Sequence, residues 1–221
     1  MEVYNAIVRF FQEGGVFMYP IMVVLAFGLA IAIERYAYLS VSRVRNQHAW
    51  NHLIPMLQAG RLAEARTWAN QSKTAIARVL SYGLARMESS RQREDIELAM
   101  EEGMMEEVPK LEKRTHYLGT LANIATLLGL LGTIIGLIQA FTAVAAANAA
   151  QKADLLASSI SVAMNTTAFG LMVGIPLLLV HALLQSKTTR LVDSLEMASV
   201  KMINNIGQQP VQRAEKGAAA A

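Results

Sequence analysis

Residues 118–141 form an apolar stretch, LGTLANIATLLGLLGTIIGLIQAF, that contains no charged side chain. The uncharged run continues to Gln151, which exceeds the ~20 residues that a helix needs to cross a hydrocarbon core. Two more uncharged stretches of comparable length occupy residues 14–33 and 155–180. Together they predict an all-α membrane protein with three transmembrane helices, with the polar remainder outside the bilayer.

Small residues recur at helical spacing in two of these stretches. Gly132 and Gly136 form a small-xxx-small pair, preceded by Gly129, which permits a second helix to approach closely. In the third stretch Gly170, Gly174 and Pro176 are expected to serve packing and local helix distortion. A lone three-helix subunit would leave small and polar residues against lipid, so we expect a ring-forming oligomer.

The chain divides into seven expected segments. They are an amphipathic N-terminal segment at 1–13, a first transmembrane helix at 14–36, a cytoplasmic helical domain at 37–114, a second transmembrane helix at 115–147, a periplasmic turn at 148–154, a third transmembrane helix at 155–186, and a cytoplasmic C-terminal helix and tail at 187–221. The apolar spans are thus expected to continue into long helical extensions outside the membrane.

Apolar periodicity predicts the helices of the polar region. Three short helices are expected at 50–59, 61–71 and 74–87, with Gly60 as the C-cap of the first. No stop signal separates residue 93 from the second span. We therefore expect one helix from Arg93 to about Ala146, bent but not ended at Pro109.

The basic residues predict the orientation in the membrane. Of the 20 Lys and Arg residues, thirteen fall between Arg35 and Arg114 and five follow Ser186, so eighteen lie on one side of the predicted spans. That side is expected to be cytoplasmic, which leaves the N-terminus periplasmic and the C-terminus cytoplasmic. The same bias accounts for the net charge of +3 without any nucleic-acid role, for which no recognition motif is present.

Three segments resemble the ExbB/TolQ/MotA proton-channel family. LLGLLGTIIGLIQAF at 127–141 resembles the second transmembrane helix of the family, and NTTAFGLMVGIPLLL at 165–179 resembles the third. AIAIERYAYL at 30–39 resembles the exit from the first helix. The order of the segments also fits. Three spans match the ExbB/TolQ branch; the flagellar MotA branch has four, so a flagellar stator is less expected.

The resemblance implies a subunit of an ion-driven motor in the bacterial inner membrane. It implies a pentamer around the single-span helices of an ExbD- or TolR-like partner, with TonB- or TolA-like proteins carrying the work to outer-membrane transport or envelope processes. The transported species would be H⁺ or Na⁺, and no cofactor is implied.

The resemblance also points to four residues of an ion pathway. Thr133 and Thr167 fall on motif threonines, which in the family line a cavity at a partner's aspartate; Asn165 and Thr166 are added as neighbours. The sequence departs from the family at Thr126, in place of a proline, and at Val162, in place of a glutamate. No carboxylate therefore lies in the spans, and an ion pathway needs a charge at depth. Either the partner supplies it or the chain does not conduct.

Three alternatives remain open from the sequence. The Thr166-Thr167 pair looks like the double threonine of sodium-driven stators, whereas protons are the prevailing habit of the family. From a different class, the chain could be a non-conducting scaffold that stabilises a single-span partner. A self-sufficient solute transporter is disfavoured because inverted repeats are not evident.

Residue types and spacings disfavour enzymes and metal proteins. There is no cysteine, no phosphate-binding loop and no nucleophile–base pair, so no enzyme activity is expected. His48 and His52 are spaced i, i+4, but no third ligand is near and no metal site is expected. The acidic residues from Glu94 to Glu107 are expected to form a solvated helix face, with docking to Lys110, Lys113 and Arg114 of a neighbouring copy as the alternative.

Overall fold

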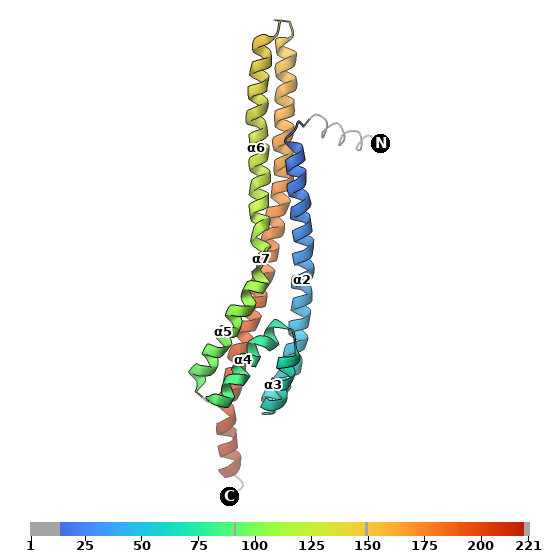
Figure 1. Ribbon diagram of the computed structural model, residues 1–221. Coiled ribbons are helices and arrows are strands. Elements are labelled where there is room, and N and C mark those ends of the chain that lie inside the picture. Colours follow the sequence, from blue (N-terminus) through green and yellow to red (C-terminus); the bar gives the residue numbers. More distant parts are fainter. Residues whose placement is uncertain (1–13, 91, 149, 219–221) are drawn as a thin grey trace, which may run out of the picture. The chain divides into compact units, whose positions relative to one another are not determined.

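The structure is a computed structural model that describes residues 14–90, 92–148 and 150–218, with side chains described to residue 205. Every regular element in these residues is an α-helix, in agreement with the predicted fold class (Figure 1). The helices are α2 (Met18–Gln58), α3 (Leu62–Gln71), α4 (Ala75–Ser89), α5 (Arg93–Glu112), α6 (Thr115–Ala146) and α7 (Lys152–Ala218). The expected amphipathic segment at 1–13 lies outside the described residues.

Within the described residues, three stretches are long and apolar enough to cross a membrane. They are Met18–Gln58, Arg93–Ala146 and Lys152–Asn205. Each contains one of the three uncharged stretches identified in the sequence. The number and order of the candidate spans are therefore those that the sequence predicts.

The first span continues without interruption into the polar region as one helix, which corrects the expected separate helix at 50–59. No glycine or proline occurs between Gly28 and Pro55, so nothing ends α2 before Gln58. The end itself is a Schellman motif at Gly60, whose φ of 71° favours glycine. There the Gly60 N–H donates to Leu57 O at 3.1 Å and the Arg61 N–H to Met56 O at 2.9 Å. The predicted C-cap is confirmed.

The expected single helix from Arg93 to Ala146 is wrong in one respect. It is interrupted between α5 and α6, at Lys113-Arg114, where Arg114 has a left-handed φ of 66°. Pro109 lies inside α5 and does not end it. Arg114 also forms an exposed ion pair, in which its guanidinium lies 3.1 Å from the Glu34 carboxylate.

The connection between the second and third spans is shorter than expected. α6 ends at Ala146 and α7 begins at Lys152, so Lys152 and Asp154 belong to the first turn of α7 and not to the turn. Asp154 at a helix N-terminus interacts favourably with the helix dipole. α7 then runs without a break for 67 residues and includes most of the expected tail.

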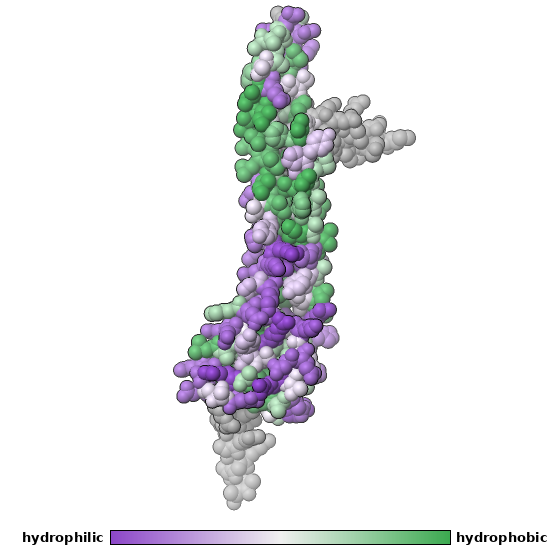
Figure 2. Space-filling model, in the orientation of Figure 1, coloured by the Kyte–Doolittle hydropathy of each residue, from purple (hydrophilic) through white to green (hydrophobic). Residues whose placement is uncertain are grey.

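The chain forms two compact units, of which unit 1 comprises Met1–Arg35 and Arg114–Leu183. Its interior is made mainly of small side chains, and Ala122, Ala125 and Ala140 have no exposed surface. Large apolar side chains point outward instead, such as Phe27 at 62% and Phe141 at 64% exposed. Figure 2 shows this surface as green, hydrophobic residues. A small-residue interior with an apolar exterior is the arrangement that membrane helices adopt in lipid.

Unit 2 comprises Tyr36–Lys113 and Leu184–Ala221. Its interior has the larger apolar side chains of a water-soluble core, including Leu53, Leu80, Met100 and Leu195, each 1% exposed or less. Its visible surface in Figure 2 is mostly hydrophilic. The hydrophobic effect can therefore stabilise this unit, whereas close packing must stabilise unit 1.

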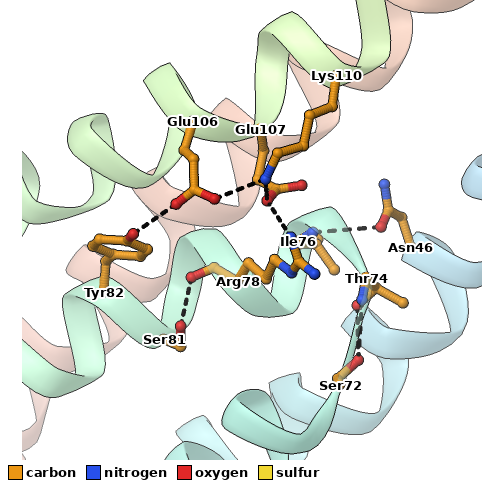
Figure 3. A network of polar contacts seen from close by, with 10 residues as sticks. All are labelled: Asn46, Ser72, Thr74, Ile76, Arg78, Ser81, Tyr82, Glu106, Glu107 and Lys110. Atoms are coloured by element: carbon orange, nitrogen blue, oxygen red, sulfur yellow. Dashed lines mark hydrogen bonds and ion pairs between the residues drawn. The ribbon is translucent and has the colours of Figure 1, made fainter.

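The acidic run on α5 is not uniformly solvated, which corrects part of the expectation. Glu94, Glu97 and Glu101 are exposed, as predicted. By contrast, the side chain of Glu107 is only 7% exposed and lies 2.9 Å from Arg78 of α4 and 2.7 Å from Lys110 (Figure 3). Within one chain, Lys110 is thus paired with the acidic run itself.

Glu106 joins the same network and its pKa is perturbed by it. Lys110 donates to the Glu106 carboxylate at 2.7 Å and the Tyr82 hydroxyl donates to it at 2.7 Å (Figure 3). The Lys110 ammonium, and after it the Tyr82 hydroxyl, hold the pKa of Glu106 below its usual value. The Glu106 and Glu107 carboxylates in turn raise the pKa of Lys110.

This network predicts a small acid dependence of the stability of unit 2. A carboxyl whose pKa is lowered by folding stabilises the fold above its unfolded pKa, near 4.5, and loses that contribution as the pH falls through the lowered value. We expect Glu106→Gln to flatten the fall in melting temperature below pH 4.5. The measurement is thermal unfolding by circular dichroism across that range. Glu101→Gln, an exposed change on the same helix, should leave the acid limb unaltered; an equal effect of both variants would contradict the assignment.

Candidate ion-pathway residues on α6 and α7

Helices α6 and α7 cross at a pair of glycines in unit 1. A Cβ atom added to Gly129 would lie 3.2 Å from the Cα atoms of Gly170 and Thr167. A Cβ added to Gly170 would lie 2.7 Å from the Ala125 carbonyl oxygen and 3.0 Å from the Gly129 Cα. Because the obstructing atoms are backbone, no side chain can rotate away. Only glycine fits at this crossing.

The other glycines singled out in the sequence lie along the same seam. Gly132 faces the Thr166 side chain, and a Cβ added to Gly136 would lie 2.8 Å from that of Ala163. On α7, a Cβ added to Gly174 would lie 2.5 Å from the Thr126 hydroxyl. Contacts within one chain thus account for all of these glycines, and they give no argument for a ring. Pro176 is exposed and does not face the seam.

The two motif threonines meet at one carbonyl group. The Thr167 hydroxyl donates across the seam to Gly129 O at 2.8 Å. In an α-helix the same carbonyl accepts the N–H of the residue four positions later, which is Thr133. The Thr133 hydroxyl donates to Leu130 O at 2.6 Å, and both threonine side chains are partly exposed. The Gly129 carbonyl thus accepts the Thr167 hydroxyl of α7 and the backbone N–H of Thr133 in α6.

Thr166 and Asn165 differ from this pair in their surroundings. Thr166 is 2% exposed, and its hydroxyl donates to the carbonyl oxygen of Gly14 while lying 3.0 Å from that of Val162. The Thr166 side chain thus links α7 to Gly14, at the start of the first apolar stretch, inside the subunit. Asn165 is partly exposed. Thr133 and Thr167 are thus partly exposed, whereas Thr166 is buried inside the subunit.

The two positions that depart from the family motifs also face the interior of the subunit. Thr126 bonds back to Ala122 O at 3.1 Å and fills the space beside Gly174. Val162 is partly buried, and its Cγ1 would lie 3.2 Å from a Cβ added to Gly15. An apolar side chain suits that position, because a carboxylate there would be desolvated against the backbone of the first span.

Ionisable groups are found only at the edges of the apolar stretches in the described part of unit 1. His181, the single such side chain between Leu155 and Gln185, packs its ring 3.5 Å from a Cβ added to Gly119. The exposed Arg114–Glu34 pair lies where the first apolar stretch ends and α6 begins. The helices α6 and α7 therefore offer hydroxyl, amide and carbonyl groups but no acid that could hold an ion at depth.

Two features of the structure were missed in the sequence. The Thr166–Gly14 hydrogen bond joins residues 152 positions apart, and no local pattern could indicate it. The sequence also gave no reason to expect the cavity between α2 and α7 in unit 2.

His52, considered as a metal ligand with His48, stacks on Trp68 with ring centroids 4.8 Å apart. No group of three potential metal-ligating side chains occurs in the described residues.

Comparison with known proteins places the pattern in a family. Residues 71–197 match the model of the MotA/TolQ/ExbB proton channel family. An ExbB homolog of Methanothermobacter thermautotrophicus is 28% identical over 205 residues, covering 92% of this chain and 71% of that protein. The ExbB-like 1 biopolymer transport protein of Synechocystis sp. is 32% identical over 186 residues, covering 83% and 72%. The TolQ protein of Haemophilus influenzae is 35% identical over a shorter region of 83 residues, covering 38% and 36%.

The family-model match covers α4, α5, α6 and the apolar part of α7, which include the seam and both motif threonines. The protein is a multi-pass membrane protein and not an enzyme. It belongs to the MotA/TolQ/ExbB proton channel family, with ExbB-like proteins among its relatives.

Proposed function

We propose that this chain is the channel-forming subunit of an ion-driven motor that energises a transport or envelope process together with a single-span partner. Thr133 and Thr167 line the pathway on the subunit's side. An ExbD- or TolR-like partner supplies the acidic group, and a TonB- or TolA-like protein receives the work. The subunits form a ring, a pentamer, around the partner helices, with the N-terminus periplasmic and the C-terminus cytoplasmic.

The observation that supports this proposal is the hydrogen bond that the Thr167 hydroxyl donates across the seam to the carbonyl of Gly129, about one helical turn before Thr133. Hydroxyl groups can hold a relay water or replace part of the hydration shell of an ion. They cannot release a proton at physiological pH. Since the uncharged stretches at 14–33, 118–151 and 155–180 contain no carboxylate, we assign the titratable group to another chain, which gives the partner its role.

The proton is the favoured ion in this proposal. A sodium ion needs several oxygen ligands in place of its water, and the Thr166-Thr167 pair could offer two hydroxyls only if both were available. The Thr166 hydroxyl is engaged with Gly14 and its side chain is 2% exposed. The Thr133 and Thr167 hydroxyls donate to backbone carbonyls, but both side chains are partly exposed, so each oxygen can still accept a hydrogen bond from a relay water.

Ion flux in vesicles tests the proposal. The chain alone should be silent, and flux should appear when a single-span partner with an aspartate in its helix is added. The alternative of a non-conducting scaffold predicts a stable complex with that partner and no flux. A chain that conducts selectively by itself would contradict the proposed division of roles.

A further inference from the structure

Unit 2 contains a cavity of about 730 Å³ between α2 and α7. Sites for small molecules and lipid headgroups commonly occupy about 300–1,000 Å³. The α2 side contributes Leu39, Ser40, Arg43, Asn46 and Trp50, and the α7 side contributes Lys187, Arg190, Leu191, Met197 and Lys201. The cavity is thus large enough for a ligand and is built by two of the three spanning helices.

The polar lining of this cavity is cationic. Arg43, Lys187, Arg190 and Lys201 line it, and no aspartate or glutamate does. None of the four forms an ion pair with a described carboxylate; the ion pairs of unit 2 involve other residues. Four cations around one cavity repel one another unless an anion lies among them. Their arrangement favours a ligand with negative charge.

An unpaired donor in the cavity wall gives a second, independent observation. Asn46 lines the cavity and is 4% exposed. Its Oδ1 accepts the Ile76 N–H at 3.4 Å, whereas its Nδ2 is buried and has no hydrogen-bond partner. A buried amide donor without an acceptor costs free energy, about 1–3 kcal/mol in typical proteins. Since Asn46 lines the cavity but its Nδ2 has almost no accessible surface, a bound anion would reach this donor only after a rotation of the side chain.

Apolar and aromatic side chains also line the cavity, beside the uncharged polar Ser40, Gln47 and Ser194. Val44 and Met197, which line the cavity, are 57% and 58% exposed although unit 2 has the core of a water-soluble domain. The Lys201 ammonium lies 5.9 Å from the centre of the Trp50 ring, and the Lys187 ammonium lies 3.5 Å from that of Tyr36. Cations beside exposed apolar groups suit an amphiphile better than a fully polar anion.

The position of the lining residues in the sequence selects the kind of amphiphile. Leu39 and Ser40 follow closely on Glu34-Arg35, where the apolar part of α2 ends, and Lys187 follows the last apolar residues of the third span. Basic pockets between spanning helices at this level bind the headgroups of anionic lipids. We propose that this cavity binds the headgroup of an anionic phospholipid, with its phosphate among Arg43, Lys187 and Arg190.

Native mass spectrometry of the full chain tests this site, with phosphatidylglycerol and phosphatidylcholine of identical acyl chains as probes. We expect phosphatidylglycerol to be retained about tenfold more than phosphatidylcholine, and Arg43→Gln or Arg190→Gln each to lower its retention about fivefold. Arg45→Gln is the matched control, since Arg45 is an exposed cation on the same helix that does not line the cavity. Equal retention of the two lipids, or an equal loss with Arg45→Gln, would overturn the proposal.

The two tryptophans localise the bound lipid. Trp50 lines the cavity and Trp68 does not, and the chain has no other tryptophan. In a Trp68→Phe variant, phosphatidylglycerol should shift the fluorescence of Trp50, whereas a Trp50→Phe variant should not respond. A response from Trp68 alone would place the lipid elsewhere and refute the site.

Two further experiments distinguish a bound lipid from other possible occupants of the cavity. Inorganic phosphate or glycerol phosphate that produces the Trp50 shift without lipid would identify a soluble phosphate ligand and overturn the lipid. A carbodiimide cross-link from Lys201 to an α5 glutamate of a second copy, unaffected by phosphatidylglycerol, would show that a neighbouring subunit covers the cavity instead. Suppression of such a cross-link by the lipid would support the proposal.

Discussion

Gly170→Ala is expected to destabilise the protein by about 1–3 kcal/mol, the usual cost of overpacking a close contact. The added Cβ would lie 2.7 Å from the Ala125 carbonyl oxygen and 3.0 Å from the Gly129 Cα, so the two helices must move apart. That movement would also lengthen the hydrogen bond from Thr167 to Gly129. Unfolding of the purified protein in mixed micelles, followed by circular dichroism, measures the loss.

Gly119→Ala provides the matched control on the same pair of helices. A Cβ at Gly119 would meet only the His181 ring, at 3.5 Å, which is an ordinary contact distance. We expect a change within about 0.5 kcal/mol. If Gly170→Ala were as mild as Gly119→Ala, the close crossing of α6 and α7 would not be a source of stability.

Thr167→Ala is expected to lower ion-coupled activity with the native partner about tenfold or more, which corresponds to roughly 1.4 kcal/mol in the barrier. The substitution removes the partly exposed hydroxyl that bonds to Gly129 O. Thr167→Ser, which keeps the hydroxyl, should restore most of the activity. Because an interhelical hydrogen bond in a membrane contributes only about 0.6–2 kcal/mol to stability, the variant should still fold.

Thr166→Ala separates the two candidate ions in the same assay. Under proton coupling it should alter stability through the lost bond to Gly14 and have little effect on activity per folded complex. Under sodium coupling it should impair activity as strongly as Thr167→Ala, and removal of sodium at fixed pH and membrane potential should stop the motor. Activity that persists without sodium and collapses with a protonophore would eliminate the sodium alternative.

The sequence predicted the helical fold and the three candidate spans because a long uncharged run has few other solutions in lipid. It could not predict the break at Arg114, since the one breaker in that region, Pro109, lies inside a helix and the left-handed residue is an arginine. The ion pair between Arg114 and Glu34 depends on tertiary structure, so no local pattern could indicate it. The existence of these helices could therefore be predicted from the sequence, but the interruption at Arg114 could not.

The site was predictable to a similar extent. Glycine spacing indicated a close-packing face on the second span but could not say whether the facing helix belongs to the same subunit; Gly129 faces Gly170 of its own chain. The motif resemblance pointed to Thr133 and Thr167. It did not distinguish Thr166, whose burial follows from the rotation of α7 and from the position of Gly14. Packing against neighbouring elements determines how a helix is rotated about its axis, so the local sequence does not predict this rotation.

Partner-dependent ion flux is the most direct test of the proposed function. Vesicles containing this chain, a single-span ExbD- or TolR-like partner from the same genome, both proteins, or both with the partner's helical aspartate changed to asparagine would be compared under one imposed pH gradient. We expect proton flux in the vesicles that contain both unaltered proteins, and background flux in the other three preparations. Flux from this chain alone, or undiminished flux with the asparagine partner, would contradict the claim that the subunit supplies hydroxyls and the partner supplies the acid.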